Sequence, residues 1–206
     1  MKRIALFVIA AALALGTAGP SMAAAAAKKP AKKAVVFADY SKQDALGNSW
    51  GDDSKGCKAT LEKKGGKAVL AVPPCADGWG AGMTLFKNGD RAIDASGKPK
   101  LVIKAKVTKG GKFTPSLNEV GTGPKEATSY QGSNGSDGEQ WWGTEQVGTG
   151  KVKDYTFKLA DFTVSGGYGN QNGNKKMDLQ AVDAVQVAVG GNQPAVTVEV
   201  SSIKFE

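Results

Sequence analysis

Two adjacent tryptophans in a polar, glycine-rich stretch are the residues best suited to ligand binding. Residues 130–145 read Tyr-Gln-Gly-Ser-Asn-Gly-Ser-Asp-Gly-Glu-Gln-Trp-Trp-Gly-Thr-Glu, a loop too polar to bury itself that leads into a strand-like segment. A flat aromatic ring can cover the C–H face of a sugar while nearby carboxylates and amides bind its hydroxyls. The stretch therefore predicts a carbohydrate-binding surface. Its candidate residues are Trp142, Trp141, Tyr130, Gln140, Glu139 and Asp137.

Strand geometry predicts which indole faces solvent. Successive side chains of a strand point to opposite faces, so Trp141 and Trp142 cannot both enter one core. If Val147 is a core residue, Trp141 shares its face and Trp142 faces out. Glu145 would then also point inward, unless a bulge or an edge position at Gly143 relieves it. We predict that Trp142 faces the ligand; the alternative is an interior tryptophan beside one exposed by accident at a sheet edge.

A second loop carries similar chemistry. Residues 46–53 read Leu-Gly-Asn-Ser-Trp-Gly-Asp-Asp and place Trp50 close to Asp52. We expect Trp50 to be a further stacking residue with Asp52 as its polar neighbour. Trp79 and Tyr168 are additional candidates, and burial in the core or under a loop is the alternative for each of these rings.

Few residues of the chain suit catalysis. The chain has no histidine, which excludes a Ser-His-Asp triad and a histidine general base. A glycoside hydrolase or lyase that uses a carboxylate pair, such as Glu139 and Glu145, stays open as an alternative, because such enzymes need two acids about 5–10 Å apart. We favour binding without catalysis.

The N-terminus predicts export. Lys2 and Arg3 precede an apolar run over residues 4–15 and small residues up to Ala23, which is the pattern of a secretory signal peptide. The run is shorter than the roughly 20 residues that span a bilayer, so no membrane span is expected. We predict a signal peptide over 1–23, an Ala/Lys/Pro linker over 24–34 and one domain over 35–206. The protein is then secreted, periplasmic or at the cell surface.

The positive charge belongs mainly to the predicted leader and linker. The chain carries 27 basic and 19 acidic residues, a net charge of +8, and residues 1–33 hold six of the basic residues and no acidic one. The remaining 21 basic and 19 acidic residues leave +2. Nucleic-acid binders usually carry a concentrated basic face, so we expect no nucleic-acid partner.

The two cysteines, Cys57 and Cys75, are predicted to form a disulfide. They lie 18 residues apart in the part of the chain that would reach an oxidising compartment. Closing this loop would stabilise the fold by about 3 kcal/mol. A metal site made of two lone cysteines, in a chain without histidine, is disfavoured.

The segment 35–206 is predicted to be all-β, an antiparallel two-sheet sandwich. Many short strands separated by Gly-rich turns are typical of this class. Residues 44–56 are expected to form a loop, and helical turns are expected only near 160–162 and 179–184. The expected strands are 35–37, 58–63, 67–72, 79–86, 101–107, 112–118, 153–159, 182–189 and 195–205.

Seven segments follow one another in an order that resembles a known family. They are Phe37-Ala-Asp39, Trp50-Gly-Asp52-Asp53, Gly80-Ala-Gly82-Met83, Leu101 to Lys106, Lys153 to Phe162, Val182 to Gly190 and Val198 to Phe205. Over about residues 35–205 this order resembles the β-jelly-roll carbohydrate-binding modules, the galactose-binding-like group of family 11 and related β-glucan-binding modules.

The resemblance implies a jelly roll that receives a polysaccharide or oligosaccharide on a concave sheet face, with no catalysis and no cofactor beyond a structural calcium ion. In the family, an acidic pair in the last strand contributes to that calcium site. Here Ser201-Ser202 stand at those positions and Asp39 keeps the other half, so Asp39 is the candidate metal residue. We expect a monomer. A structural or assembly protein at the cell surface is the third interpretation, and it predicts an exposed apolar patch.

Overall fold

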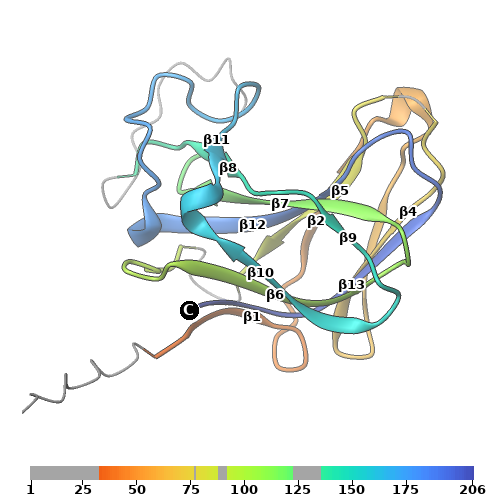
Figure 1. Cartoon of the computed structure of the whole chain (residues 1–206), viewed down its shortest axis with the longest axis horizontal. Coiled ribbons are helices and arrows are strands. Elements are labelled where there is room, and N and C mark those ends of the chain that lie inside the picture. The colour runs from red at the N-terminus through yellow and green to blue at the C-terminus, as the bar shows by residue number, and fades with distance from the viewer. Residues whose placement is uncertain (1–32, 77, 88–91, 123–135) are drawn as a thin grey trace, which may run out of the picture. The chain divides into compact units, whose positions relative to one another are not determined.

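Alternating hydrophobic residues build two antiparallel sheets in the computed structural model, which describes residues 33–76, 78–87, 92–122 and 136–206 (Figure 1). The first sheet contains, in spatial order, β10 (Val152–Lys158), β6 (Lys100–Val107), β13 (Val196–Phe205), β4 (Lys67–Val72) and β3 (Thr60–Lys64), and β1 (Val35–Asp39) also pairs with β13. The second contains β11 (Thr163–Val164), β8 (Gln140–Trp142), β7 (Lys112–Glu119), β12 (Val182–Val189), β5 (Ala81–Phe86) and β2 (Gly47–Gly51), and β9 (Gln146–Val147) pairs with β7. The predicted fold class, an all-β two-sheet sandwich, is confirmed.

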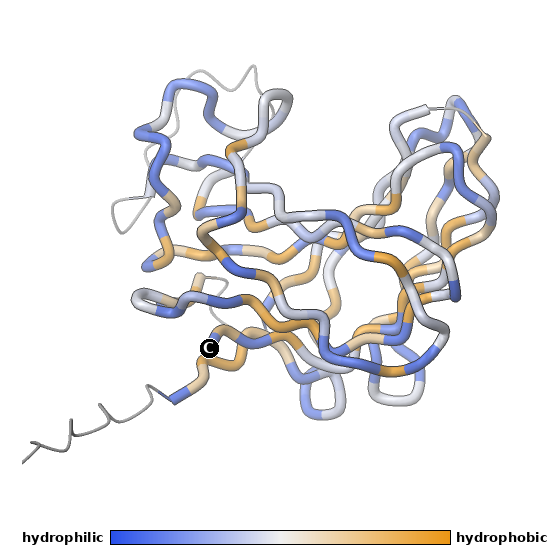
Figure 2. The backbone as a smooth tube through the Cα atoms, viewed as in Figure 1, coloured by the Kyte–Doolittle hydropathy of each residue, from blue (hydrophilic) through white to orange (hydrophobic). Residues whose placement is uncertain are grey.

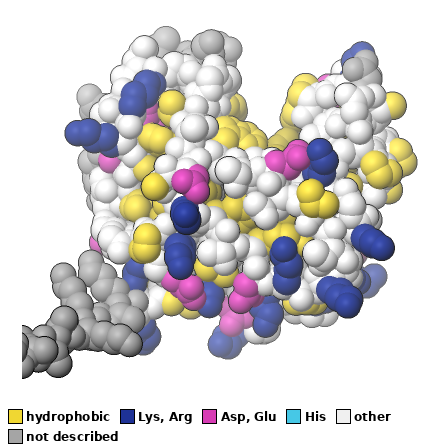
Figure 3. All heavy atoms as spheres, viewed as in Figure 1, with side chains coloured by type: hydrophobic (Ala, Val, Ile, Leu, Met, Phe, Trp, Pro, Cys, Tyr) yellow, Lys and Arg dark blue, Asp and Glu magenta, His cyan; other side chains and the backbone are white. Residues whose placement is uncertain are grey.

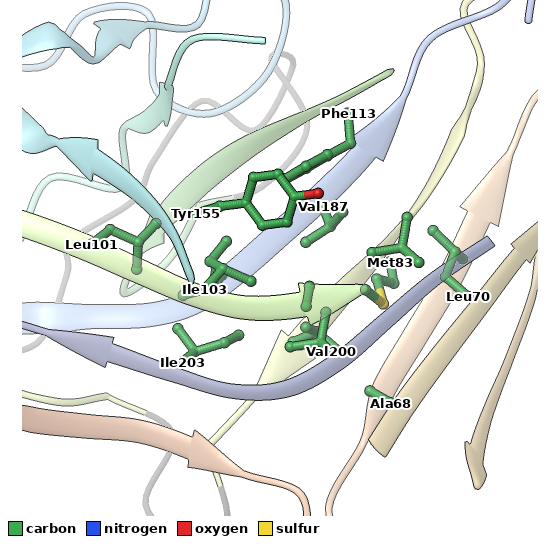
Figure 4. Close-up of a cluster of buried hydrophobic side chains, with 14 of the residues drawn as sticks. Ala68, Leu70, Met83, Leu101, Ile103, Phe113, Tyr155, Val187, Val200 and Ile203 are labelled. Atoms are coloured by element: carbon green, nitrogen blue, oxygen red, sulfur yellow. The ribbon is translucent and has the colours of Figure 1, made fainter. Parts of the chain in front are cut away.

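The core lies between the two sheets and follows directly from the alternation. In β6, Ile103 and Ala105 are buried, whereas Lys104 and Lys106 between and beyond them are exposed. Phe113 of β7 packs edge-on against Tyr155 of β10, with ring centroids 4.9 Å apart. Figure 2 shows hydrophobic residues following the strands of both sheets, and Figure 4 shows side chains from both sheets filling the space between them. Burial of this apolar surface is the main stabilising contribution.

A bulge in β13 explains why the alternation of hydrophobic residues shifts by one position within this strand. Val196, Val198 and Val200 are buried, but the next buried residues are Ile203 and Phe205, which are out of step by one. The register between β13 and β6 shifts between Val200 and Ser202, so the extra residue returns the following side chains to the core.

The second sheet has one apolar and one mixed face. In β12, Val185 and Val187 point into the core, so Gln186 points to the other face. In β5, Met83 and Leu85 point into the core, so Thr84 points the same way as Gln186. The outer face of the second sheet therefore carries polar side chains that the core does not need.

One predicted loop contains a strand. Residues 47–51 form β2 at the edge of the second sheet, where residues 44–56 were expected to be irregular. Glycine permits this pairing, because Gly47 has a φ of 123° and a Cβ at that position would lie 1.9 Å from the Thr84 carbonyl oxygen. The segment is rich in turn-forming residues, which favoured the prediction of a loop over a strand.

The expected helical turns are two short 3₁₀ segments, η3 (Leu159–Asp161) and η4 (Leu179–Ala181), and a third, η1 (Asp53–Lys55), follows β2. The second turn is shorter than expected, because β12 begins at Val182. The predicted signal peptide and all but the last two residues of the linker lie outside the described residues. None of the helical segments in the described ranges is long and apolar enough to cross a bilayer.

The predicted disulfide between Cys57 and Cys75 is confirmed. Both residues are buried, and their Cα atoms lie 5.1 Å apart. The bridge joins the segment after β2 to the segment before β5, and the backbone of Cys75 also pairs with Gln193. It therefore holds together the loops at one end of the second sheet.

Candidate functional site

A groove of about 720 Å³ lies on the outer face of the second sheet. Figure 3 shows the hollow between two raised sides of the domain, with hydrophobic side chains within it. The volume falls in the range of about 300–1,000 Å³ that is typical of ligand sites. Four aromatic residues line the groove: Trp50, Trp79, Trp142 and Tyr168.

Two of these rings form a stacked pair on one side. The indoles of Trp50 and Trp79 lie 5.7 Å apart at their centroids, with an interplanar angle of 24°. Trp50 rests on the sheet, because a Cβ at Gly82 would lie 2.5 Å from its ring, and its Nε1 donates to Thr84 Oγ1 at 3.2 Å. Trp79 is 63% exposed. The Trp50 indole is thus held by the sheet, whereas the Trp79 indole is exposed to solvent.

The loop that carries Trp79 is held from below. One carboxylate oxygen of Asp52 accepts from the Trp79 backbone N–H at 3.4 Å, and the other accepts from the Ser54 hydroxyl at 2.7 Å. The Cys57–Cys75 disulfide closes the same loop region. Asp52 does not line the groove. Its side chain positions an aromatic residue, and the predicted contact between Asp52 and the ligand is not supported.

The two adjacent tryptophans point to opposite faces, as strand geometry requires. Trp141 is 8% exposed and belongs to the core, whereas Trp142 is half-buried and lines the groove. Val147, however, is 52% exposed and is not the core residue that the orientation of Trp142 was predicted from. The strand is interrupted at residues 143–145, between β8 and β9. The alternation of side chains therefore does not continue from Trp141 to Val147. Trp141 is therefore withdrawn as a ligand-contacting residue.

Gln140 supports the neighbouring ring. Its Oε1 accepts from Trp142 Nε1 at 2.9 Å, and its Nε2 donates to Asn118 Oδ1 at 3.1 Å. Gln140 is 2% exposed, although it lines the floor of the groove. Both ends of the amide are engaged within the protein, so its main effect is to fix the plane of the Trp142 indole.

The remaining polar lining is almost free of charge. Thr84, Thr114 and Gln186 lie on the floor, and Glu145 lies on the wall. The Glu145 carboxylate pairs with Lys112 Nζ at 3.1 Å. Glu145 is the only charged side chain among the described lining residues, and this ion pair balances its charge.

Two predicted carboxylates lie outside the groove lining. Glu139 has a side-chain exposure of 0%, contacts Lys175 Nζ at 3.4 Å and accepts from the Lys175 backbone N–H at 3.2 Å. Asp137 accepts from the Asn174 backbone N–H at 2.6 Å. Both therefore brace the loop over residues 173–175. The assignment of Glu139 and Asp137 to a sugar-contacting surface is corrected accordingly, and Tyr130 lies outside the described residues.

No protein-family model matches the sequence, and no curated protein matches it. Solved structures do match. The family 11 carbohydrate-binding module from Clostridium thermocellum in complex with a β-1,3-1,4-mixed-linked tetrasaccharide matches with a TM-score of 0.61 and 16% identity, over 84% of this chain and 94% of that one. The family 30 carbohydrate-binding module of the cellulosomal cellulase Cel9D-Cel44B of Clostridium thermocellum matches with a TM-score of 0.54 and 16% identity, over 84% and 97%.

This chain has the jelly-roll fold of those carbohydrate-binding modules. The resemblance predicted from the order of seven sequence segments is thereby confirmed for the fold. At 16% identity the likeness carries no individual residue across, so the groove of this jelly roll has to be interpreted from its own side chains.

Near β8, three carboxylates gather behind the jelly-roll groove. Oxygens of Glu119, Asp137 and Asp178 lie within 4.8 Å of one another. The two oxygens of Glu119 already accept from Trp141 Nε1 at 2.8 Å, from the backbone N–H groups of Asp178 and Glu139 at 2.9 and 3.1 Å, and from a serine hydroxyl at 3.3 Å. Burial raises the pKa of the Glu119 carboxyl to about 7, and the neighbouring Asp178 carboxylate adds to the effect.

This cluster supplies only part of a calcium shell. Calcium binds about six to eight oxygens, and the oxygens of Glu119 are already occupied by four donors from the protein. We therefore interpret the cluster as a hydrogen-bonded support beneath Trp141.

Asp39 does not fit the predicted calcium site. Its carboxylate accepts from the Ser41 hydroxyl at 2.6 Å and pairs with Lys42 Nζ at 3.1 Å, and these two contacts lower its pKa. In the β1–β13 pairing, Asp39 lies opposite Ser202, which supplies no carboxylate. The Asp39 carboxylate is already paired with Lys42, and the residue opposite it is a serine. The site therefore lacks the negative charge that calcium sites provide.

The polar floor of the groove was not predicted from the sequence. Gln186 and Thr84 belong to strands that were predicted, yet neither was singled out. The signal was present in the alternation, because Val185, Gln186 and Val187 place a long polar side chain on the face opposite the core. The partner strands could not be read from the sequence, so nothing indicated that this face was shared with Trp50 and Trp142.

Proposed function

We propose that this protein is a non-catalytic carbohydrate-binding protein that holds a polysaccharide or oligosaccharide in the groove of the second sheet. The observation that supports this most directly is the set of four aromatic rings along one groove, two of them at least 40% exposed. Exposed aromatic rings are unfavourable in water, and a ligand that covers them removes this apolar surface from water. A pyranose offers an apolar face of matching shape.

The ligand that fits this lining is uncharged. The groove combines aromatic faces with amides and hydroxyls, and its one carboxylate, Glu145, is paired with Lys112. Such groups bind hydroxyls without requiring a counter-charge. We propose a neutral glycan, with a β-glucan as the first choice, since the family 11 module that shares the fold was solved with a β-1,3-1,4-mixed-linked tetrasaccharide.

The position of the carboxylates favours binding over hydrolysis. A glycoside hydrolase places two acids across the scissile bond, about 5–10 Å apart. The pair considered from the sequence, Glu139 and Glu145, is split between a buried loop support and the groove wall. Among the described lining residues, Glu145 has no second acid facing it.

We propose further that the protein acts outside the cytoplasm, as a monomer. The N-terminal sequence has the pattern of a secretory signal peptide, and the buried Cys57–Cys75 disulfide suits an oxidising compartment.

Affinity electrophoresis tests the proposed function. The native protein is run through gels containing barley mixed-linkage β-glucan, hydroxyethyl cellulose or carboxymethyl cellulose, and a gel without polysaccharide gives the reference mobility. We expect retardation by at least one of the two neutral polysaccharides, and weaker retardation by carboxymethyl cellulose. Trp142→Ala should reduce the retardation, whereas Val147→Ala, a truncation of an exposed residue outside the groove lining, should not.

Two outcomes would overturn the proposal. Equal mobility in all gels would remove carbohydrate binding, and the surface-assembly interpretation would replace it. Release of reducing sugar that disappears in Glu145→Gln would instead identify a hydrolase.

A further inference from the structure

Gln186 lies at the centre of the groove floor. It belongs to β12, which lies between β7 and β5 in the second sheet. In the strand register it lies opposite Thr84 on one side and Ser116 on the other, and Ser116 lies opposite Trp142. One row across the sheet therefore runs from Trp142 through Gln186 to Thr84, the residue that holds Trp50.

The Gln186 side chain is largely buried and has no hydrogen-bond partner among the described residues. It is 7% exposed, and no described residue donates to or accepts from its amide. Neither amide atom belongs to the fully enclosed unpaired atoms of the described residues, and Gln186 lines the groove. The amide of Gln186 can therefore be reached from the groove.

Gln140 provides the contrast within the same floor. It is a second buried glutamine, but both ends of its amide are engaged by Trp142 and Asn118. Buried polar groups in proteins are nearly always hydrogen-bonded to protein or to water, so an unpaired amide that faces a groove can bind a ligand hydroxyl in place of water. A primary amide offers two donors and an acceptor side by side, which suits two neighbouring hydroxyls that accept and donate in turn.

We propose that Gln186 hydrogen-bonds two neighbouring hydroxyls of the sugar unit at the centre of the groove, and that this unit must therefore be unsubstituted on the side facing the floor. This inference rests on the proposed function and adds the residue that selects the central unit. The rings of Trp50 and Trp142 lie on opposite sides of Gln186 in the strand order, so the central unit is the one that both stacking surfaces flank. An apolar ligand would leave the amide unpaired, which makes such a ligand unfavourable.

The first test is Gln186→Leu, measured by titration calorimetry with a mixed-linkage glucan tetrasaccharide and by electrophoresis with barley β-glucan. Leucine keeps most of the volume and removes both the donors and the acceptor. We expect the Kd to rise about tenfold or more, as the loss of two neutral hydrogen bonds implies. Gln180→Leu is the matched control, because Gln180 is exposed and lies outside the groove lining, and it should leave the Kd unchanged.

The second test separates hydrogen bonding from shape. Gln186→Glu has the same shape as the native residue and, once protonated, offers a donor beside an acceptor. We expect weak binding at pH 7 and recovery toward the native Kd below about pH 4.5, where a carboxylic acid is protonated. The native protein measured at both values provides the reference. A merely structural role, such as covering the buried Ser116 hydroxyl, would lower the melting temperature and show no such recovery.

The outcomes distinguish this inference from the proposed function. If no polysaccharide slows the native protein, both the proposed function and this inference are wrong. If the native protein binds and Gln186→Leu binds within about twofold of it, a difference of less than about 0.5 kcal/mol, only the role of Gln186 is overturned. Should Gln186→Leu fail to fold, the pH dependence of Gln186→Glu decides alone.

Discussion

Truncation of Trp79 offers a sharp test of the stacking surface, because this ring can be removed without opening the core. Trp79 is 63% exposed and lies on a loop between β4 and β5, with one face stacked on Trp50. The variant Trp79→Ala leaves the sheets and the backbone contact to Asp52 intact. Its effect on binding can therefore be separated from an effect on folding.

The magnitude follows from the exposed area. An indole can bury about 200 Å², so an exposure of 63% leaves about 125 Å² available. If a sugar covers about half of this area, about 60 Å² of apolar surface is buried, which at about 25 cal/mol per Å² is about 1.5 kcal/mol. The Kd of Trp79→Ala should then rise about tenfold.

The assay is calorimetric titration with a mixed-linkage glucan oligosaccharide, together with thermal unfolding of both proteins. Val36→Ala is the matched control, since Val36 is 57% exposed and lies on β1 in the other sheet. We expect the control to bind as the native protein does. Loss of the ring–ring contact with Trp50 should lower the stability of Trp79→Ala by about 1 kcal/mol.

An unchanged Kd in Trp79→Ala, with binding still lost in Trp142→Ala, would refute the reasoning for this ring. It would mean that Trp79 only shields Trp50 and that the ligand lies on the other side of the groove. A Kd that rises equally in Val36→Ala would show instead that binding follows global stability.

Three further predictions concern the support of the groove. Opening the Cys57–Cys75 bridge by reduction should lower the unfolding free energy by about 3 kcal/mol, measured by urea unfolding with and without dithiothreitol, and an identical midpoint would contradict the proposed tie. Gln140→Leu should weaken binding about threefold, by freeing the indole that it orients, and should broaden the tryptophan fluorescence; a native Kd would show that Trp142 is held by packing alone. Because the folded-state pKa of Glu119 is about 7, above its ordinary value of 4.5, the native state holds an extra proton between these values, so the melting temperature should fall from pH 5.5 to pH 8 in the presence of a chelator. The chain has no histidine to titrate in this window, and Glu119→Gln should flatten the slope; a native slope in that variant would exclude Glu119 as its source.

The fold was largely accessible from the sequence because alternation is a local signal. In β10, the buried Tyr155 and Phe157 alternate with exposed residues, and a strand can be recognised from such a run alone. The bulge in β13 and the strand at residues 47–51 were not accessible. Both depend on the position of the neighbouring strand. At Gly47 the Thr84 carbonyl oxygen lies too close for any residue with a Cβ.

The site was accessible only in part, for the same reason. The type of ring and the opposite orientation of Trp141 and Trp142 follow from the two-residue period of a strand. Whether a polar neighbour contacts the ligand depends on hydrogen bonds across the chain, which the sequence does not display. Glu139 and Gln140 adjoin the tryptophans in sequence, yet their side chains are engaged by Lys175 and by Asn118 and Trp142.

Two of the aromatic rings of the groove lie on strands and two lie on connecting segments, and this determines which of them can change without disturbing the fold. Trp142 and Trp50 lie on strands, so an insertion that displaced either one would also turn core residues outward. Trp79 and Tyr168 lie on connecting segments, where length and composition can vary without disturbing the sandwich. If the proposed function holds, exchange of the two loop rings would change the glycan preference while Trp50 and Trp142 on the sheet stay unchanged.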